Sequence, residues 1–103
     1  MRRPIAAAAT TLVLTGLGGT AMAGTIERAC LSSDRPGISR SLCGCIQQAA
    51  DLTLSTKDQR LAASFFKDPH RAQEVRQSDR RSDEEFWERY VNFGTAAETY
   101  CRN

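Results

Sequence analysis

The sequence predicts an all-α protein, a small bundle of about four to five short helices held together by two disulfides. Three observations support this fold class. Apolar residues recur every three or four positions along most of the chain, no segment alternates apolar and polar residues as a strand does, and four cysteines occur in a short chain. The segment over about 83–100 is predicted to be the longest helix.

Residues 1–23 have the three parts of a secretory signal peptide. Two arginines give a positive start, an uncharged Ala- and Leu-rich stretch extends to Leu17, and Ala21-Met22-Ala23 supplies small residues for cleavage. The apolar run is too short for a membrane span, which needs about 20 apolar residues. We therefore expect cleavage before Gly24 and a periplasmic or secreted mature protein, residues 24–103, that forms a single helical domain.

The charge of the mature chain is balanced. The whole chain contains 14 Lys and Arg against 12 Asp and Glu. Arg2 and Arg3 leave with the signal peptide, and no acid leaves with them, so the mature chain has no net charge. This balance removes the electrostatic basis for nucleic-acid binding and for a polybasic membrane patch. We expect neither nucleic-acid binding nor stable membrane insertion after cleavage.

Helical spacing predicts two helices in the first half of the mature chain. A short helix is expected within Gly24–Asp34, with Thr25 as its N-cap. The sequence Arg35-Pro36-Gly37 ends this helix and turns the chain. Apolar residues then recur at helical spacing from about Ser39 to Leu54, which predicts the second helix.

Three more helix starts are predicted from capping residues. Thr56 and Gln59 fit a capping box that opens the third helix. Asp68 and Pro69 fit the N-cap and the first position of a fourth helix, which is short and polar over His70–Arg80.

The last helix has the clearest predicted start. Ser82 and Glu85 fit a capping box, and aromatic and small residues then recur at helical steps to about Tyr100. Each adjacent aromatic pair, Phe65-Phe66 and Phe86-Trp87, must direct one ring away from the core centre. Phe66 or Trp87 is therefore expected to be partly exposed.

The cysteines are Cys30, Cys43, Cys45 and Cys101, and an even number in a small exported protein predicts two disulfides. Cys43 and Cys45 point to different sides of a helix, because two residues rotate it by about 200°. Cys30 and Cys43 each lie six residues from the Pro36-Gly37 turn, so antiparallel helices would place them side by side. Three connectivities are possible, and we prefer Cys30–Cys43 with Cys45–Cys101.

Cys43-Gly44-Cys45 is the motif that suggests catalysis. A close cysteine pair can exchange disulfides, so a thiol–disulfide redox protein is one hypothesis. Cys30 and Cys101 are available as permanent partners, which favours structural disulfides. No metal site or cofactor is expected, because the C-x₂-C spacing is missing and the single histidine, His70, has no ligand beside it. No catalytic triad can be assembled, so we expect no other enzymatic activity.

A basic group of residues precedes an acidic group across Ser82. The basic residues are Arg71, Arg76, Arg80 and Arg81, and the acidic residues are Asp83, Glu84, Glu85 and Glu88. One interpretation is a solvated surface whose charges compensate each other. The other is a contact site for an anion or an acidic partner, with Trp87 beside it, because guanidinium groups suit carboxylates and phosphates.

The functional hypothesis that we prefer is a non-enzymatic binding or accessory protein that contacts another envelope protein or a small anion. A third hypothesis, besides the redox protein, is a structural or stress-protective envelope protein.

Four segments carry a resemblance that covers nearly the whole mature chain. They are Cys30-Leu31, residues 39–48, residues 65–76, and Phe86-Trp87 with Tyr100-Cys101. The chain resembles a family of small exported four-cysteine helical proteins of alphaproteobacteria, some of which carry the label "arginine transporter". The resemblance implies export and this cysteine layout. Transport is not expected, because the mature chain has no membrane span and is too short for a two-lobed solute-binding protein.

Overall fold

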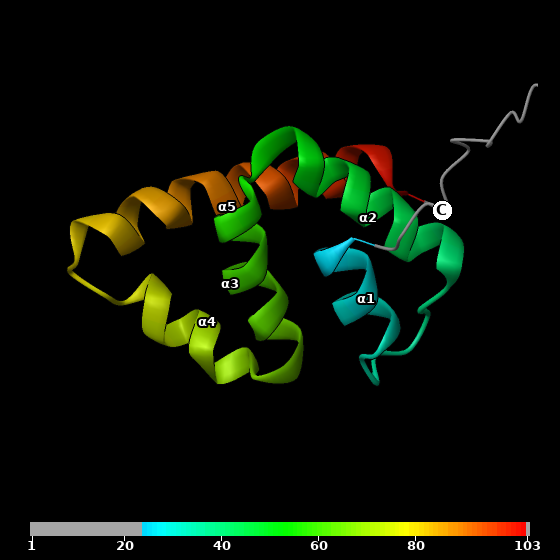
Figure 1. Ribbon diagram of the computed structural model, residues 1–103, viewed down its shortest axis with the longest axis horizontal. Coiled ribbons are helices and arrows are strands. Elements are labelled where there is room, and N and C mark those ends of the chain that lie inside the picture. Colours follow the sequence, from blue (N-terminus) through cyan, green and yellow to red (C-terminus); the bar gives the residue numbers. More distant parts are fainter. Residues whose placement is uncertain (1–23, 103) are drawn as a thin grey trace, which may run out of the picture.

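A computed structural model describes residues 24–102, which form five helices and no strand (Figure 1). The helices are α1 (Thr25–Leu31), α2 (Arg40–Thr53), α3 (Thr56–Lys67), α4 (Pro69–Arg76) and α5 (Arg81–Tyr100). The predicted all-α class is confirmed, and the last helix is the longest. The predicted signal peptide lies outside the described residues.

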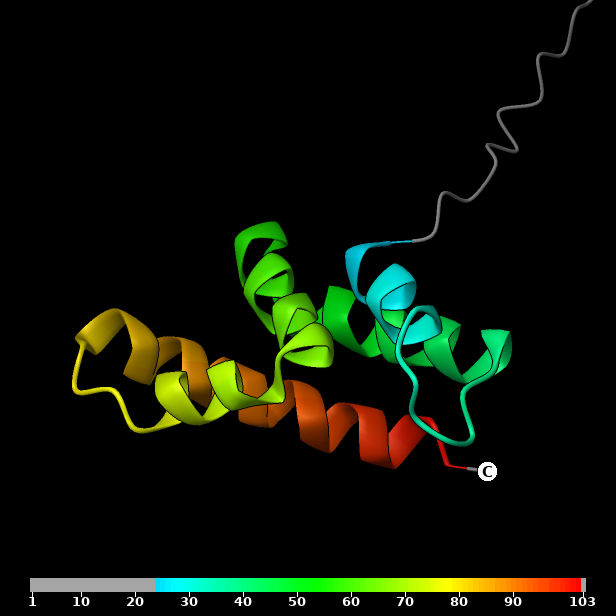
Figure 2. The same ribbon diagram turned by 90° about the horizontal axis from the view of Figure 1, so that it is seen from below.

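The helices pack in a closed ring. The main contacts join α5 to α2, α2 to α1, α1 to α3, α3 to α4, and α4 back to α5. Figure 2 shows α5 running beside α4 towards one end and beside α2 towards the other. Because α1 and α3 are not adjacent in sequence, the chain places them side by side only through this packing.

Apolar and aromatic side chains fill the centre of the ring. The buried core residues are Ile26, Ala49, Ala50, Leu54, Ala62, Phe65, Val75, Phe86 and Phe93. The Phe65 ring lies edge-on to the rings of Phe86 and Tyr90, at centroid distances of 6.0 and 5.3 Å. Edge-to-face pairs of this kind add to the free energy of burial. Phe66 and Trp87 are half-buried, so the expected division of each aromatic pair is confirmed.

The predicted starts of α1 and α3 are each wrong by one residue. The N-cap of α1 is Gly24, and Thr25 is the first helical residue. The N-cap of α3 is Ser55, whose hydroxyl accepts a hydrogen bond from the amide of Asp58 at 3.1 Å. The predicted capping partner, Gln59, uses its side chain elsewhere. Serine is on average a better N-cap than threonine, so the cap falls on Ser55 rather than on Thr56.

The last two helices also differ from the prediction. Asp68 occupies the N-cap of α4, but its side chain makes no capping hydrogen bond, and α4 ends at Arg76 rather than continuing to Arg80. In α5 the N-cap is Arg80 rather than Ser82, so the helix starts at Arg81. The last four predicted residues of α4 instead form the turn into α5.

A buried glutamine joins three helices. Gln47 of α2 accepts a hydrogen bond from the backbone amide of Glu27 in α1, at 2.9 Å. Its side-chain nitrogen donates to Asp51 Oδ1 and to Gln59 Oε1, both at 2.8 Å. Gln47 is only 8% exposed, so these bonds satisfy a side-chain amide that would otherwise be costly to bury. They also help to set the position of α1 relative to α3.

Candidate functional site

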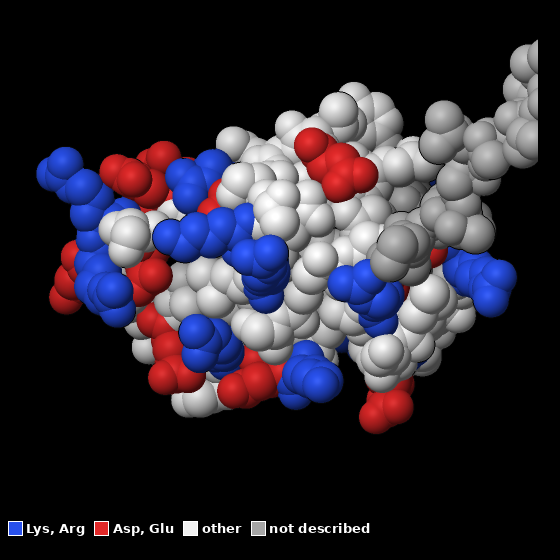
Figure 3. All heavy atoms as spheres, viewed as in Figure 1, with Lys and Arg blue, Asp and Glu red and all other residues white. Residues whose placement is uncertain are grey.

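A groove of about 500 Å³ lies between α1 and α3. Its first wall comes from α1 and the loop that follows it, with Arg28, Ala29, Ser32, Ser33 and Asp34. Its second wall comes from α3, with Arg60, Ala63, Ser64, Phe66 and Lys67. In Figure 3, which has the same view as Figure 1, Lys and Arg side chains lie over both helices with uncharged atoms between them. This volume is within the range of small-ligand sites.

The second wall follows from helical spacing. Residues three, four and seven positions apart share one face of a helix, so Arg60, Ala63, Ser64 and Lys67 form one row along α3. Phe65 and neighbouring apolar residues of the same helix point into the core instead. Burial of that apolar face therefore leaves the row with a cation near each end and two small residues between them.

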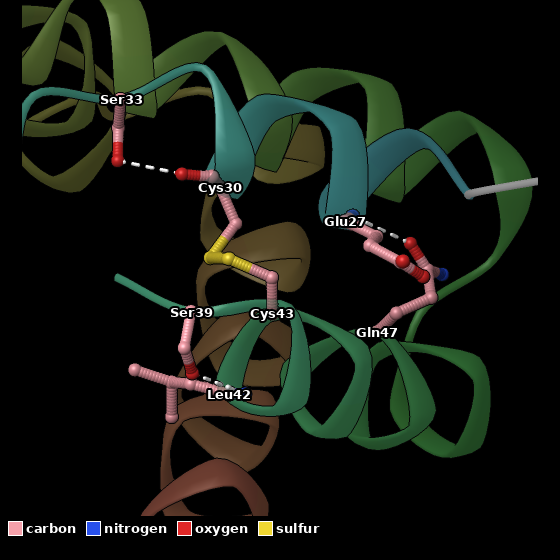
Figure 4. Close-up of a disulfide and its surroundings, with 7 residues drawn as sticks. All are labelled: Glu27, Cys30, Ser33, Ser39, Leu42, Cys43 and Gln47. Atoms are coloured by element: carbon pink, nitrogen blue, oxygen red, sulfur yellow. Dashed lines mark hydrogen bonds between the residues drawn. A yellow bond between two sulfur atoms is a disulfide. The ribbon is translucent and has the colours of Figure 1, made fainter. Parts of the chain in front are cut away.

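The first wall is fixed in place by covalent and polar contacts. Cys30 of α1 forms a disulfide with Cys43 of α2 (Figure 4). The side chain of Ile26 is fully buried, and Gln47 holds the amide of Glu27 from the opposite end of the helix. A helix of seven residues is marginal by itself, so these contacts stabilise α1 and the groove beside it.

The charge of the groove is mainly positive. Three basic residues line it, Arg28, Arg60 and Lys67, against one acid, Asp34. Arg60 and Lys67 are exposed, and neither forms an ion pair within residues 24–102. The groove is therefore suited to an anionic group.

An aromatic ring closes one part of the groove. Phe66 packs against the core and lines the groove at the same time. The Arg35 guanidinium lies over its ring, 5.2 Å from the centroid, in cation–π geometry. The same charge acts on Tyr90, where burial raises the pKa of the hydroxyl above its ordinary value and Arg35 opposes that rise.

The arginines predicted as a contact site are all exposed, and the structure brings only two of them together. Arg71 and Arg80 line a second, smaller hollow between α4 and α5, where Glu74 and Asp83 also lie. Arg76 and Arg81 lie outside it. This hollow has as many acids as bases, so its charges compensate each other. Figure 3 shows the same mixture of signs at this end of the molecule.

Trp87, which was predicted to lie beside these arginines, is instead at the edge of the apolar core. Trp87 is half-buried, and its ring lies 5.0 Å from that of Tyr90. It packs against the apolar core and lines neither hollow.

A third hollow contains an ion pair that joins α3 to α5. Arg89 donates two hydrogen bonds to the carboxylate of Asp58, at 2.6 and 3.1 Å. Asp58 is buried, whereas the side chain of Arg89 is 46% exposed. The hydrogen bonds from Arg89, helped by its positive charge and by Ser55, lower the pKa of Asp58 although burial opposes this change. The two hydrogen bonds satisfy both charged groups, so we assign this ion pair a role in stabilising the fold.

The cysteines form the two disulfides that the sequence favoured, Cys30–Cys43 and Cys45–Cys101. Cys43 and Cys45 are therefore bonded to different partners rather than to each other. No free cysteine remains among the described residues. In this oxidised state the Cys43-Gly44-Cys45 sequence offers no thiolate to attack a substrate disulfide.

Metal-ligating side chains do not gather in the described part of the chain, residues 24–102. His70 is exposed at the start of α4, and this part of the chain contains no cluster of three metal-ligating side chains. None of the helices described is both long and apolar enough to cross a membrane.

Sequence reasoning missed the groove because its walls come from segments about 30 residues apart. Arg28, Arg60 and Lys67 belong to no motif, and each looks like an ordinary surface cation in the sequence. The one feature of the sequence that could have indicated the groove is the row on α3. There two cations lie two helical turns apart, on either side of Ala63 and Ser64.

No known family model, curated protein or solved structure matches the chain. The groove is therefore interpreted from its own geometry and charge.

Proposed function

We propose that this is a small non-enzymatic binding protein of the cell envelope, which uses the α1–α3 groove to hold an anionic group of another envelope protein or a small anion. The observation that carries the proposal is the excess of cations in that groove. Arg60 and Lys67 are exposed and have no acidic partner within residues 24–102, so a ligand would not have to displace one. Guanidinium and ammonium groups recognise carboxylates and phosphates.

The chemistry of the groove favours weak and reversible binding. An exposed ion pair contributes about 0.2–1 kcal/mol. Two such pairs, from Arg60 and Lys67, with a small apolar contact therefore support transient association rather than permanent assembly. Binding should also weaken as salt is added, because salt screens exposed charges.

A location outside the cytoplasm is supported by the cysteines. Disulfides form and persist in the periplasm and in secreted proteins, and cytosolic reductants remove most of them. Two disulfides in a chain of this size fit that setting. The predicted signal peptide supports it independently.

Titration by nuclear magnetic resonance tests this proposal. The ¹⁵N-labelled, oxidised protein is titrated with sodium phosphate and with acetyl-Glu-Ala-Leu-Glu-amide, and the neutral analogue with glutamine in place of glutamate is the ligand control. We expect the amide signals of α1 and α3 along the groove to move with the anionic ligands and not with the analogue.

Two double variants then locate the binding surface. R60Q/K67Q should weaken binding by roughly two- to thirtyfold, because two exposed charged contacts of about 0.2–1 kcal/mol each are lost. R76Q/R81Q also removes two exposed arginines, but these lie outside the groove, so its affinity should match that of the native protein. If R76Q/R81Q loses binding and R60Q/K67Q keeps it, the site is the arginine group at the α4–α5 end. If no amide moves with any anion, the binding function is wrong.

A further inference from the structure

The spacing and hydrogen-bonding state of the groove residues narrow the class of ligand. Resting on the proposed anion-binding function, we infer that the ligand is an extended peptide segment in polyproline II conformation. Two of its acidic side chains are three residues apart, and its backbone N–H groups face the serines of the groove. A free inorganic anion lacks these features.

The two cations set the first requirement. Arg60 and Lys67 lie seven residues apart on α3, and an α-helix rises about 1.5 Å per residue, so their backbones are about 10 Å apart along the axis. A polyproline II segment rises about 3.1 Å per residue and has three residues per turn. Its residues i and i+3 therefore share one face about 9 Å apart, which matches the distance between the cations.

The serines set the second requirement. The hydroxyl of Ser33 donates to the carbonyl of Cys30 at 2.7 Å, and that of Ser64 donates to the carbonyl of Leu61 at 2.6 Å. A hydroxyl has one hydrogen and two lone pairs, so a serine that already donates can offer a ligand only an acceptor. These two serine acceptors in the groove suit the N–H groups of a peptide backbone.

The remaining surface of the groove agrees with an extended chain. A polyproline II segment forms no internal hydrogen bonds, so its N–H groups are available to acceptors. Ala29 and Ala63 are small and allow a backbone to approach closely. Phe66 lines the groove with the Arg35 guanidinium over its ring, and aromatic-lined grooves are a common way to bind this conformation.

A series of peptides tests the spacing. The peptides are acetylated and amidated, have the same length and composition, and carry two glutamates that are adjacent, three positions apart or six positions apart. We expect the peptide with the three-residue spacing to bind the oxidised protein roughly fivefold more tightly than the other two, because only this peptide reaches both cations. Isothermal titration calorimetry at low salt measures the three affinities.

Single variants link the preference to named atoms. R60Q should remove the advantage of the three-residue spacing, because one acid then has no partner, whereas the matched surface variant R76Q should keep it. S64A removes one acceptor without changing the charge, and alanine is a good helix former. S64A should therefore weaken binding of the peptide by a fewfold, and by more than it weakens binding of sodium phosphate.

The outcomes separate this inference from the function on which it rests. If all three peptides bind the groove equally, or if phosphate binds there as tightly as the best peptide, the groove binds anions and the peptide inference is wrong. If neither the peptides nor phosphate bind the groove, both the inference and the proposed function are wrong. A spacing preference that R60Q abolishes and R76Q preserves supports both.

Discussion

A side chain from another helix performs the capping role at the start of α1. The N-cap is Gly24, which has no side chain to accept a hydrogen bond, and the amide of Glu27 donates instead to Gln47 of α2. Gly24 lies so close to Gln47 that a Cβ atom added there would overlap the side-chain amide. Glycine is therefore needed at position 24 for space, because its φ of −69° is open to any residue.

We predict that G24S destabilises the protein, although serine is normally a better N-cap than glycine. The new side chain would displace Gln47 from its three partners, and we expect the free energy of unfolding to fall by about 1 kcal/mol. Urea denaturation of the oxidised protein measures the change.

A double-mutant cycle with Q47A checks the cause. Without the glutamine amide the serine has room to cap α1 itself, so G24S should be neutral or slightly stabilising in the Q47A background. If G24S lowers stability equally in both backgrounds, its contact with Gln47 is not the cause of the destabilisation.

The Asp58–Arg89 pair predicts a dependence of stability on pH. The pKa of Asp58 is lowered in the folded protein, mainly by its hydrogen bonds with Arg89. The pair therefore contributes stability above the unfolded pKa of about 3.9 and loses it as the pH falls through the lower folded pKa. We expect R89Q to lower the free energy of unfolding by about 1–2 kcal/mol at neutral pH, a small value because Arg89 is partly exposed to water.

Denaturation of native protein and R89Q at neutral pH and near pH 2 tests this prediction. The two should differ at neutral pH, and the difference should shrink as the pH falls. The matched control is R81Q, which changes an exposed arginine at the first position of the same helix. It should be neutral or slightly stabilising, because a positive charge at a helix N-terminus is unfavourable. A constant difference between native protein and R89Q at both pH values would contradict the assigned pKa.

At the scale of helices, the two disulfides have different surroundings. Cys30 and Cys43 are both fully buried where α1 packs on α2. Cys45 and Cys101 join the start of α2 to the end of α5, and both are half-buried. A reductant needs access to sulfur. The difference in burial alone should therefore make Cys45–Cys101 easier to reduce than Cys30–Cys43.

We predict that mild reduction of the native protein opens Cys45–Cys101 before Cys30–Cys43. Limited treatment with dithiothreitol, alkylation of the free thiols and peptide mass spectrometry would identify the labelled cysteines. We expect Cys45 and Cys101, the partly exposed pair, to be labelled first. Label appearing first on Cys30 and Cys43 would show that α1 opens more readily than the end of α5.

At the scale of the whole molecule, stability depends on the disulfides, because the core is small for a chain of this size. A core of about nine buried residues in a domain this short supplies only a few kcal/mol of net stability. The chain-entropy estimate gives about 4 kcal/mol for a loop of 56 residues and about 3 kcal/mol for one of 13 residues.

We predict that full reduction unfolds the protein at 37 °C, because the contribution of the two disulfides exceeds the net stability left by burial. Far-ultraviolet circular dichroism should show loss of the helical signal after reduction and alkylation, with the oxidised protein as the control. A reduced protein that keeps its native helical signal would contradict this prediction.

The architecture could be predicted from the sequence because it depends mainly on local spacing. The helices over 40–53 and 56–67 follow from apolar periodicity, and the pairing of Cys30 with Cys43 follows from a turn halfway between them. Gly37 adopts a φ of 83° in that turn, a conformation that residues with side chains rarely adopt. Helix starts were less predictable, since Ser55 and Thr56 are neighbouring residues that can both cap a helix, although serine is the better cap by type.

Interactions between distant residues could not be predicted in the same way. Asp58 and Arg89 are 31 residues apart, and nothing in either neighbourhood indicates that they form a pair. The same holds for the groove, because Arg28 meets the row on α3 only after the ring of helices closes. The arginines that were prominent in the sequence owe that prominence to their clustering along the chain, whereas the structure places Glu74 and Asp83 beside Arg71 and Arg80.

The positions of the two disulfides also decide how the protein would carry a mechanical load. Pulling on both ends of residues 24–102 would send tension from α1 across Cys30–Cys43, through Gly44, and across Cys45–Cys101 to the last residues. Residues 46–53 of α2, together with α3, α4 and α5, lie inside the covalent loop from Cys45 to Cys101 and are bypassed by this path. The oxidised protein would therefore behave under stretching as a short, nearly inextensible link, with most of its fold shielded from the applied force.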